Sequence, residues 1–188
     1  MHMKIEFLGR FLVAAALLTG GAIAKTKTPA DAPRTDQEIA NALRHEVVMY
    51  PRYSIFDDIG FHVLNGQVEL SGDVTQPFKK SDIGRLAEKV PGVTSVANNI
   101  QVLPLSDVDD RLRLQIARAV YGNSVLSRYA LMAQPPIHII VNNGQVTLTG
   151  VVSTDMEKQI AGMCAGGAGL SFGPVINNLV VENPARKS

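Results

Sequence analysis

The chain has 188 residues, with 18 lysines and arginines against 17 aspartates and glutamates, so its formal net charge at pH 7 is +1. Proteins that bind nucleic acid through its phosphates carry a marked basic excess, and the even balance of charges argues against that class of partner. The one cysteine, Cys164, has no partner in the chain, which excludes an intramolecular disulfide.

The first 24 residues have the form of a secretory signal peptide. Lys4 and Arg10 give this segment a positive charge, residues 11–18 form a short apolar stretch, and residues 22–24 read AIA, which is a small-residue cleavage site. We therefore expect cleavage near Ala24 and a periplasmic or otherwise exported protein. Because no cysteine lies at the cleavage site, we do not expect a lipoprotein.

Cleavage near Ala24 removes two of the 18 basic residues and one of the 17 acidic residues, which leaves 16 of each. The mature chain is then formally neutral. It begins with residues 25–34, a polar stretch that contains Pro29 and Pro33, and we expect a linker there. No later stretch offers the roughly 20 apolar residues that a transmembrane helix needs.

A helix is expected to begin at Thr35, because Thr35 and Glu38 have the spacing of a capping box. Apolar residues follow at helical spacing: Ile39, Ala42, Leu43 and Val47. A similar stripe recurs further along the chain in Leu112, Ile116, Ala119 and Val120. Each stripe precedes a copy of the same hairpin pattern.

Two β-hairpins are predicted by this repeated pattern, which reads NGQVELSGDV at residues 65–74 and NGQVTLTGVV at residues 143–152. An Asn-Gly pair favours a type I′ turn, which needs a positive φ at both central residues. The repeated motif residues are Asn65, Gly66 and Gly72 in the first copy and Asn143, Gly144 and Gly150 in the second.

Two-residue turns also fix the pairing register of each hairpin. The apolar faces then pair Phe61 with Leu70, Val63 with Val68, Ile139 with Leu148 and Val141 with Val146. The opposite faces carry His62 with Glu69 in the first copy and Ile140 with Thr147 in the second. Because the second outward face lacks a carboxylate, we expect it to be the more covered of the two.

A second helix and a third strand complete each copy. The helices are indicated by two apolar stripes: Ile83, Leu86, Ala87 and Val90, and then Met156, Ile160, Met163 and Cys164. The closing strands read VANNIQV at residues 96–102 and VINNLVV at residues 175–181. The predicted fold class is α+β, with two tandem small domains of order helix-strand-strand-helix-strand. The expected boundaries are 35–104 and 105–183, followed by a tail at 184–188.

This ordered set of motifs resembles the BON family of bacterial envelope proteins. The resemblance depends on the two hairpin motifs, the two closing strands and PGV at residues 91–93. It implies a three-stranded sheet backed by two helices, and a non-catalytic module associated with phospholipid surfaces, osmotic or envelope stress survival and partner assembly.

The second copy departs from this pattern in two places. Where PGV would stand it reads CAGGAGLSFGPV at residues 164–175, and the glycines predict that its second helix ends early. This stretch is either a mobile binding loop or simply a longer connection. The second departure is a longer link from helix to hairpin, since Tyr50 to Gly66 spans sixteen positions and Tyr121 to Gly144 spans twenty-three.

This longer connection supplies the candidate binding residues Arg118, Arg128, Tyr129, Leu131 and Met132. Apolar side chains beside arginines suit a surface that meets lipid headgroups and the acyl boundary. The alternative is that these residues cover the second domain's own core. Three aspartates nearby, Asp107, Asp109 and Asp110, reduce the electrostatic attraction to an anionic surface.

Residues capable of catalysis do not form a recognisable constellation. His62 and His138 lack partners at metal-ligand spacing, and Cys164 lies on an apolar helical stripe. Asp57 and Asp58 are expected to form a solvated turn. We therefore expect no enzyme, no metal and no cofactor.

The sequence thus predicts a binding module of the cell envelope. The expected partner is a phospholipid membrane surface or an envelope protein, with no nucleic acid and no small-molecule substrate. The alternative function is a protein-protein interaction or chaperone-like module in the periplasm.

Overall fold

The computed structural model describes residues 34–169 and 173–182. The expected signal peptide at 1–24, nearly all of the linker and the tail at 184–188 lie outside the described residues. Both copies of the repeat belong to a single unit that spans residues 33–188.

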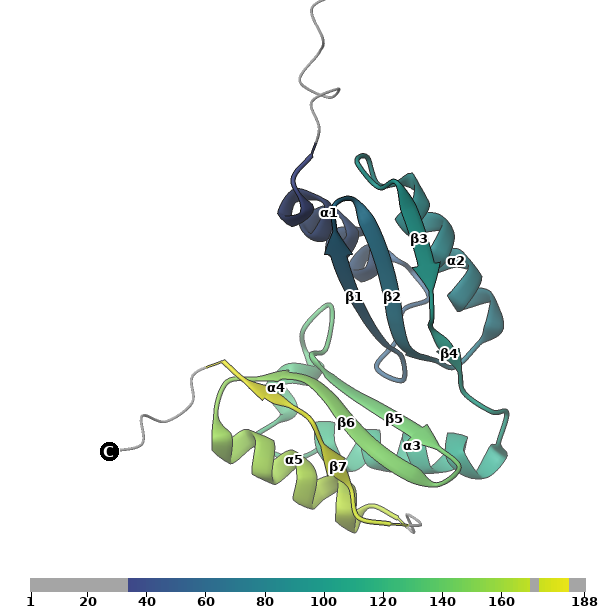
Figure 1. The fold of residues 1–188 in the computed structure, drawn as a ribbon. Coiled ribbons are helices and arrows are strands. Elements are labelled where there is room, and N and C mark those ends of the chain that lie inside the picture. Colours follow the sequence, from purple (N-terminus) through teal and green to yellow (C-terminus); the bar gives the residue numbers. More distant parts are fainter. Residues whose placement is uncertain (1–33, 170–172, 183–188) are drawn as a thin grey trace, which may run out of the picture. The chain divides into compact units, whose positions relative to one another are not determined.

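The first repeat is a sheet with helices against one of its faces (Figure 1). Its elements are α1 (Asp36–Met49), β1 (Asp58–Leu64), β2 (Gln67–Val74), α2 (Pro77–Lys89), β3 (Ser95–Asn98) and β4 (Gln101–Val102). The strand order is β1-β2-β3, with β4 also paired to β2. β1 is antiparallel to β2, whereas β3 and β4 are parallel to it.

The second repeat has the same order with one short helix added (Figure 1). Its elements are α3 (Asp107–Tyr121), α4 (Ser127–Ala130), β5 (Ile137–Asn142), β6 (Gln145–Val152), α5 (Asp155–Gly167), β7 (Ile176–Asn177) and β8 (Val180–Val181). β5 is antiparallel to β6, and β7 and β8 are parallel to it. The predicted α+β fold class, with two repeats of the same element order, is therefore confirmed.

Both hairpins turn where the Asn-Gly pairs predict. Asn65 and Gly66 have φ values of 51° and 75°, and Asn143 and Gly144 have 50° and 78°. These positive values are those of a type I′ turn. The predicted registers are confirmed in both hairpins.

An aspartate in the first turn of a helix holds each hairpin turn. The carboxylate of Asp36 accepts hydrogen bonds from the amides of Asn65 and Gly66, each at 2.8 Å. Asp109 does the same for the amides of Asn143 and Gly144, each at 2.9 Å. The repeat thus ties its first helix to its hairpin through one charged group.

The predicted third strand is divided in both repeats by a pair of asparagines. The side-chain amide of Asn98 donates to the Lys80 carbonyl at 2.8 Å, and that of Asn177 donates to the Lys158 carbonyl at 2.7 Å. A glycine in the facing helix makes room for each amide, because a Cβ at Gly84 or Gly162 would lie 2.7 or 2.8 Å from it.

Each repeat has its own hydrophobic core. The buried residues of the first are Ile39, Leu43, Val47, Val68, Leu70, Val74, Ile83, Ala87, Val90 and Ile100. Those of the second are Leu112, Ile116, Val120, Leu126, Tyr129, Ile137, Ile139, Val141, Val146, Leu148, Val152, Ala161, Ala165 and Leu179. Two separate cores agree with a tandem repeat rather than one six-stranded domain.

The structure corrects two expectations about the second repeat. α5 does not end early, since it continues through Gly166 and Gly167 and has 13 residues, as many as α2. The excess in the connection is also smaller than Tyr50 and Tyr121 suggest. The buried helix positions Ile39 and Leu112 are 73 residues apart, and the hairpin turns are 78 apart, so five residues are extra.

The outward face of the second sheet is covered only in part. Ile140 is buried, with 6% of its surface exposed, whereas Ile176 and Val180 are 44% and 61% exposed. The first repeat contributes to this covering, because Asp58 and Asp73 line one pocket with Ile140, and Tyr53 lies against His138 on the same face. The expectation of a covered face therefore holds for the hairpin and is wrong for β7 and β8.

Candidate functional site

The helix α3 separates a buried stripe from an exposed one. Leu112, Ile116 and Val120 recur at helical spacing and are buried, which fixes the rotation of the helix. Leu114 is then 48% exposed, and the side chain of Arg118 is exposed as well. Arg118 lies in the last turn, where its positive charge is favourable to the helix dipole.

The connection after α3 folds into the short helix α4 because two of its side chains enter the core. Leu126 has no exposed surface and Tyr129 has 3%. Leu131 and Met132 follow at once and point outward, with 90% and 48% of their surfaces exposed. The five extra residues therefore supply both core packing and an exposed apolar pair.

Arg128 joins this connection to α5. Its Nη2 lies 2.5 Å from Oε1 of Glu157, and its guanidinium lies over the Tyr129 ring at 4.8 Å. The Tyr129 hydroxyl donates to Glu157 at 3.0 Å. Burial alone would raise the pKa of Glu157, but its bonds to Tyr129, Arg128 and Thr154 outweigh that and hold the pKa below its usual range.

The first repeat has an ion pair in the corresponding place with the charges reversed. Lys79 precedes Glu157 by 78 residues, the offset of the hairpin turns. Its Nζ lies 2.6 Å from Asp57, which is in the α1–β1 connection. In both repeats a charged pair thus fastens the connection to the start of the second helix, and Arg128 has that structural role.

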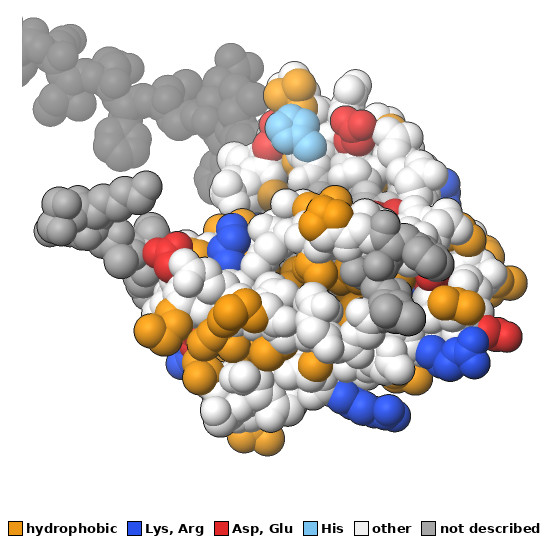
Figure 2. Space-filling model, turned by 90° about the horizontal axis from the view of Figure 1, so that it is seen from below, with side chains coloured by type: hydrophobic (Ala, Val, Ile, Leu, Met, Phe, Trp, Pro, Cys, Tyr) orange, Lys and Arg blue, Asp and Glu red, His pale blue; other side chains and the backbone are white. Residues whose placement is uncertain are grey.

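An apolar groove of about 390 Å³ is lined mainly by residues of α3 and of the connection that follows it. Its lining residues are Ile55, Leu114, Ala117, Arg118, Tyr121, Ala130 and Pro135. Arg118 supplies the one formal charge among them, and no carboxylate of the described residues lies within ion-pair distance of it. Figure 2 shows hydrophobic side chains gathered in patches on one face, with lysine and arginine side chains beside them.

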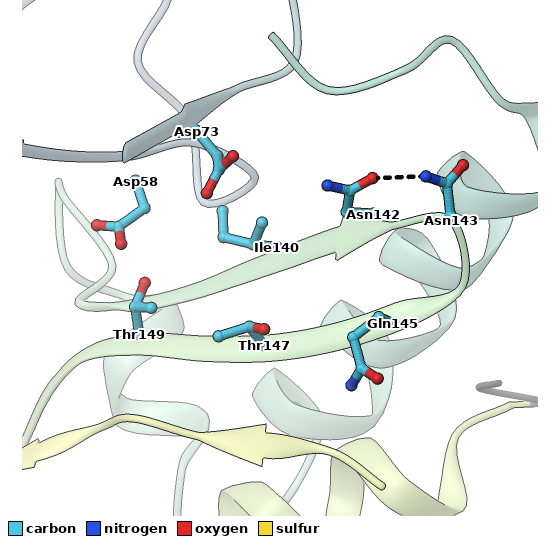
Figure 3. Close-up of a pocket in the computed structure, with 8 residues that line it drawn as sticks. All are labelled: Asp58, Asp73, Ile140, Asn142, Asn143, Gln145, Thr147 and Thr149. Carbon is cyan, nitrogen blue, oxygen red and sulfur yellow. Dashed lines mark hydrogen bonds between the residues drawn. The ribbon is translucent and has the colours of Figure 1, made fainter. Parts of the chain in front are cut away.

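A second pocket, of about 340 Å³, has the opposite character (Figure 3). Its lining consists of Asp58, Asp73, Ile140, Asn142, Asn143, Gln145, Thr147 and Thr149. Burial, together with the neighbouring Asp58, raises the pKa of Asp73. Two carboxylates without a basic side chain repel anions, so this pocket does not suit a phosphate headgroup.

The five candidate binding residues fall into two groups in the structure. Arg118, Leu131 and Met132 are exposed. Arg118 lines the apolar groove, Leu131 directly follows its lining residue Ala130, and Met132 lines a separate pocket with Val151 and Glu182. Tyr129 is a core residue and Arg128 is paired with Glu157, which agrees with the alternative that part of this segment covers the core. The hairpin glycines Gly72 and Gly150 have φ values of 104° and 106°.

The residues considered for catalysis have structural surroundings. Cys164 is half-buried against the second core, and His62 is exposed on β1. His138 lies with Nδ1 2.6 Å from the Asp57 carbonyl and its ring 5.3 Å from that of Tyr53. Among the described residues, no group of three or more His, Cys, Asp or Glu side chains is placed to hold a metal ion.

The expectation of a solvated Asp57 is wrong. Asp57 has no exposed surface, and its carboxylate accepts bonds from Ser54, Thr75 and Lys79. Asp57 and Lys79 are separated by 22 positions in the sequence, and no local pattern predicts that they pair. The pair is indicated only by comparison with the second copy, where Arg128 and Glu157 form an ion pair with the charges reversed.

Within residues 34–169 and 173–182, no helix combines the length and the apolar character that crossing a bilayer requires.

Comparison with known proteins identifies one domain type twice. The profile of the BON domain matches residues 35–104 and 113–183. No curated protein matches the chain.

Solved structures similar to this chain include two of CdsD, described as a structural protein of the type III secretion system of Chlamydia trachomatis. One has 18% identity and a TM-score of 0.28, and the match covers 79% of this chain and 94% of that one. The other, a C-terminal domain, has 17% identity and a TM-score of 0.29, with 79% and 99% covered.

Proposed function

The chain belongs to the BON-domain family, and from that membership we propose that it is a non-enzymatic envelope module that attaches to phospholipid surfaces through its second repeat. BON domains are associated with membrane and phospholipid binding and are generally non-catalytic. The part of the chain proposed to meet the lipid consists of Leu114, Arg118, Leu131 and Met132, called the α3–α4 surface below.

The observation that carries the proposal is that the second repeat exposes an apolar pair, Leu131 and Met132, together with an unpaired arginine, Arg118. Leu131 and Met132 are exposed directly after α4, and Arg118 lines the apolar groove together with Ala130, the residue that precedes Leu131. A surface that lies on a bilayer combines apolar side chains at the acyl boundary with basic side chains at the headgroups. The α3–α4 surface has both.

The expected attachment is weak. Burial of Leu131 and Met132 contributes on the order of 3 kcal/mol at best, and one arginine near an anionic surface adds about 1 kcal/mol. Arg128 contributes little, because its charge is already compensated by Glu157. Binding of this kind is sensitive to salt, since the arginine acts through a screened charge.

The same proposal places the mature chain in the periplasm after cleavage near Ala24, where membrane attachment supports envelope integrity under osmotic or other envelope stress. The segment that carries this part of the proposal lies outside the described residues, and the sequence features of residues 1–24 support it.

Flotation with anionic and neutral vesicles tests the proposal. We expect the mature protein to float with anionic vesicles at low salt. The change Leu131→Ser with Met132→Ser should lower binding at least tenfold, a loss of about 1.4 kcal/mol. Arg118→Glu should abolish the preference for anionic over neutral lipid. Arg128 is left unchanged, because its loss would open the bond to Glu157.

Matched controls come from the first repeat. Met49 and Leu64 are 63% and 57% exposed, and Arg44 is exposed on α1. Met49→Ser with Leu64→Ser, and Arg44→Glu, should leave flotation unchanged. If the variants of the α3–α4 surface remain folded by circular dichroism and float as well as the parent, this surface does not bind lipid, and the protein-interaction alternative gains support.

A further inference from the structure

The free edge of a sheet presents backbone groups that a neighbouring chain can pair with, and the two repeats differ in how this edge is protected. In the second repeat β5 forms one edge of the sheet, and β7 and β8 form the opposite one. In a two-residue hairpin the residues next to the turn bond to the partner strand, so the amides and carbonyls of Ile137, Ile139 and Val141 point away from β6.

All three of these β5 residues have partners. The Tyr121 hydroxyl donates to the Ile137 carbonyl at 2.5 Å, and Arg113 Nη2 donates to the Val141 carbonyl at 2.5 Å. The Ile139 amide donates to the Ile55 carbonyl at 2.7 Å. Two side chains of α3 and one loop carbonyl therefore close the edge of the second sheet.

The corresponding edge of the first repeat lacks both of these side chains. With the helix offset of 73 residues, Arg113 corresponds to Ala40 and Tyr121 to Val48. Neither alanine nor valine has a hydrogen-bond donor in its side chain. Side chains of the preceding helix therefore close the β5 edge of the second repeat, whereas the β1 edge of the first repeat has no such side chains.

The edge strand β1 is open as a result. The amides and carbonyls of Phe61 and Val63 point away from β2, and among the described residues no hydrogen bond reaches them. Their side chains are half-buried, whereas Ile139 and Val141 at the same positions of β5 have no exposed surface. An additional strand beside β1 would satisfy these groups and cover both side chains.

The sequence of β1 suits a second copy of itself. From Ile59 to Leu64 the strand carries no formal charge other than any on His62, and it has no lysine or proline of the kind that keeps edge strands apart. At its start, the Ile59 backbone lies close to Tyr53, so Phe61 and Val63 are the positions where a neighbouring strand would pair. Two antiparallel copies satisfy these positions reciprocally.

We propose that the chain forms a symmetric dimer in which β1 of one copy pairs antiparallel with β1 of a second copy. Phe61 of each copy exchanges two backbone hydrogen bonds with Val63 of the other. The two-fold axis then passes between the two His62 residues, which face each other as a non-hydrogen-bonded pair. A two-fold contact of this kind is closed and does not continue into a fibre.

Sedimentation velocity of the mature protein over a wide range of concentration tests the dimer. The parent should change from monomer to dimer as the concentration rises. Ala40→Arg with Val48→Tyr transfers the closure of β5 to β1 and should leave a monomer at every concentration. Asn41→Arg with His45→Tyr adds the same side chains at exposed neighbouring positions of α1 and should dimerise like the parent.

Cross-linking tests the pairing of the two β1 strands directly. It can refute the proposal even if the Ala40→Arg with Val48→Tyr variant misfolds. In a Cys164→Ser background, His62→Cys places two thiols across the two-fold axis, at a spacing that a disulfide accepts. Oxidation should give a covalent dimer. Glu69→Cys, directly opposite His62 on β2, should give none. A parent that stays monomeric, or equal cross-linking of both cysteines, would overturn the proposal.

The dimer does not depend on lipid binding. The Ala40→Arg with Val48→Tyr variant keeps Arg118, Leu131 and Met132, so it should lose dimerisation and retain flotation. Loss of flotation in the Leu131→Ser with Met132→Ser variant bears only on the α3–α4 surface.

Discussion

Asp57 and Lys79 form the most buried ion pair of the first repeat. Their surfaces are 0% and 7% exposed, and Nζ lies 2.6 Å from the carboxylate. Burial raises the pKa of Asp57, but the hydrogen bonds from Lys79, Ser54 and Thr75 outweigh it, so the pKa lies below its usual range. The folded state therefore stabilises the ionised carboxylate of Asp57 relative to its protonated form.

Removal of this carboxylate should destabilise the protein by on the order of 3 kcal/mol, because Asp57→Asn leaves the Lys79 ammonium buried without its counter-charge. Lys79→Met alone should also destabilise it, and the double change should recover part of the loss. Urea unfolding of the parent and the three variants at pH 7 measures the coupling between the two residues.

The pH dependence of stability follows from the same pair. A depressed carboxyl pKa contributes stability above the unfolded value of about 3.9, and this contribution is lost as the pH falls through the folded value. The parent should therefore lose more stability than Asp57→Asn on acidification below about pH 4. An equal acid response in both proteins would show that Asp57 is not held ionised by its partners.

At the scale of single elements, Gly150 in β6 shows where the hairpin backbone tolerates no side chain. Its φ is 106°, and a Cβ there would lie 1.9 Å from the Pro136 carbonyl oxygen. Gly166 in α5 is the matched contrast, since the nearest atom to its Cβ would be Val175 at 4.0 Å. One glycine is required by geometry, whereas the other only weakens its helix.

Alanine should therefore have opposite effects at these two positions. Gly150→Ala should lower the free energy of unfolding by on the order of 3 kcal/mol, because it combines strain with a backbone clash. Gly166→Ala should raise it by about 0.5 to 1 kcal/mol through helix propensity. Thermal unfolding of both variants checks the pair, and a neutral result at Gly150 would refute the clash.

The elements most accurately predicted from the sequence are those that local chemistry determines. The Asn-Gly turns dictate the registers, and Thr35 with Glu38 does begin α1 through a capping box. The division of the third strand was missed, although both copies repeat its determinants. Gly84 with Asn98 and Gly162 with Asn177 are the residues that a comparison of the two copies would have identified.

The candidate site was less predictable because exposure depends on tertiary packing. Tyr129 and Leu131 are two residues apart in one apolar stretch, yet one is 3% and the other 90% exposed. Only the fold of α4 decides which of them enters the core. The same limit applies to Asp57, whose partner Lys79 is distant in sequence and comes near through the packing of α2.

At the scale of the whole molecule, the duplicated fold has been adapted differently in its two copies. The second repeat has a closed β5 edge, the α4 insertion and an exposed apolar pair, Leu131 and Met132. The first repeat has an open β1 edge and a connection whose Ile55 and Phe56 pack against the second core. We assign lipid attachment to the second repeat and pairing of copies to the first.

Amide hydrogen exchange with and without anionic vesicles tests the central claim, that the second repeat meets the membrane. We predict slower exchange with vesicles in residues 114–121 and 127–134 and no change in the hairpin at 58–74, because only the α3–α4 surface contacts lipid. Neutral vesicles should give a smaller effect, since Arg118 then has no anionic partner. Protection confined to the first repeat, or none with either lipid, would contradict the account.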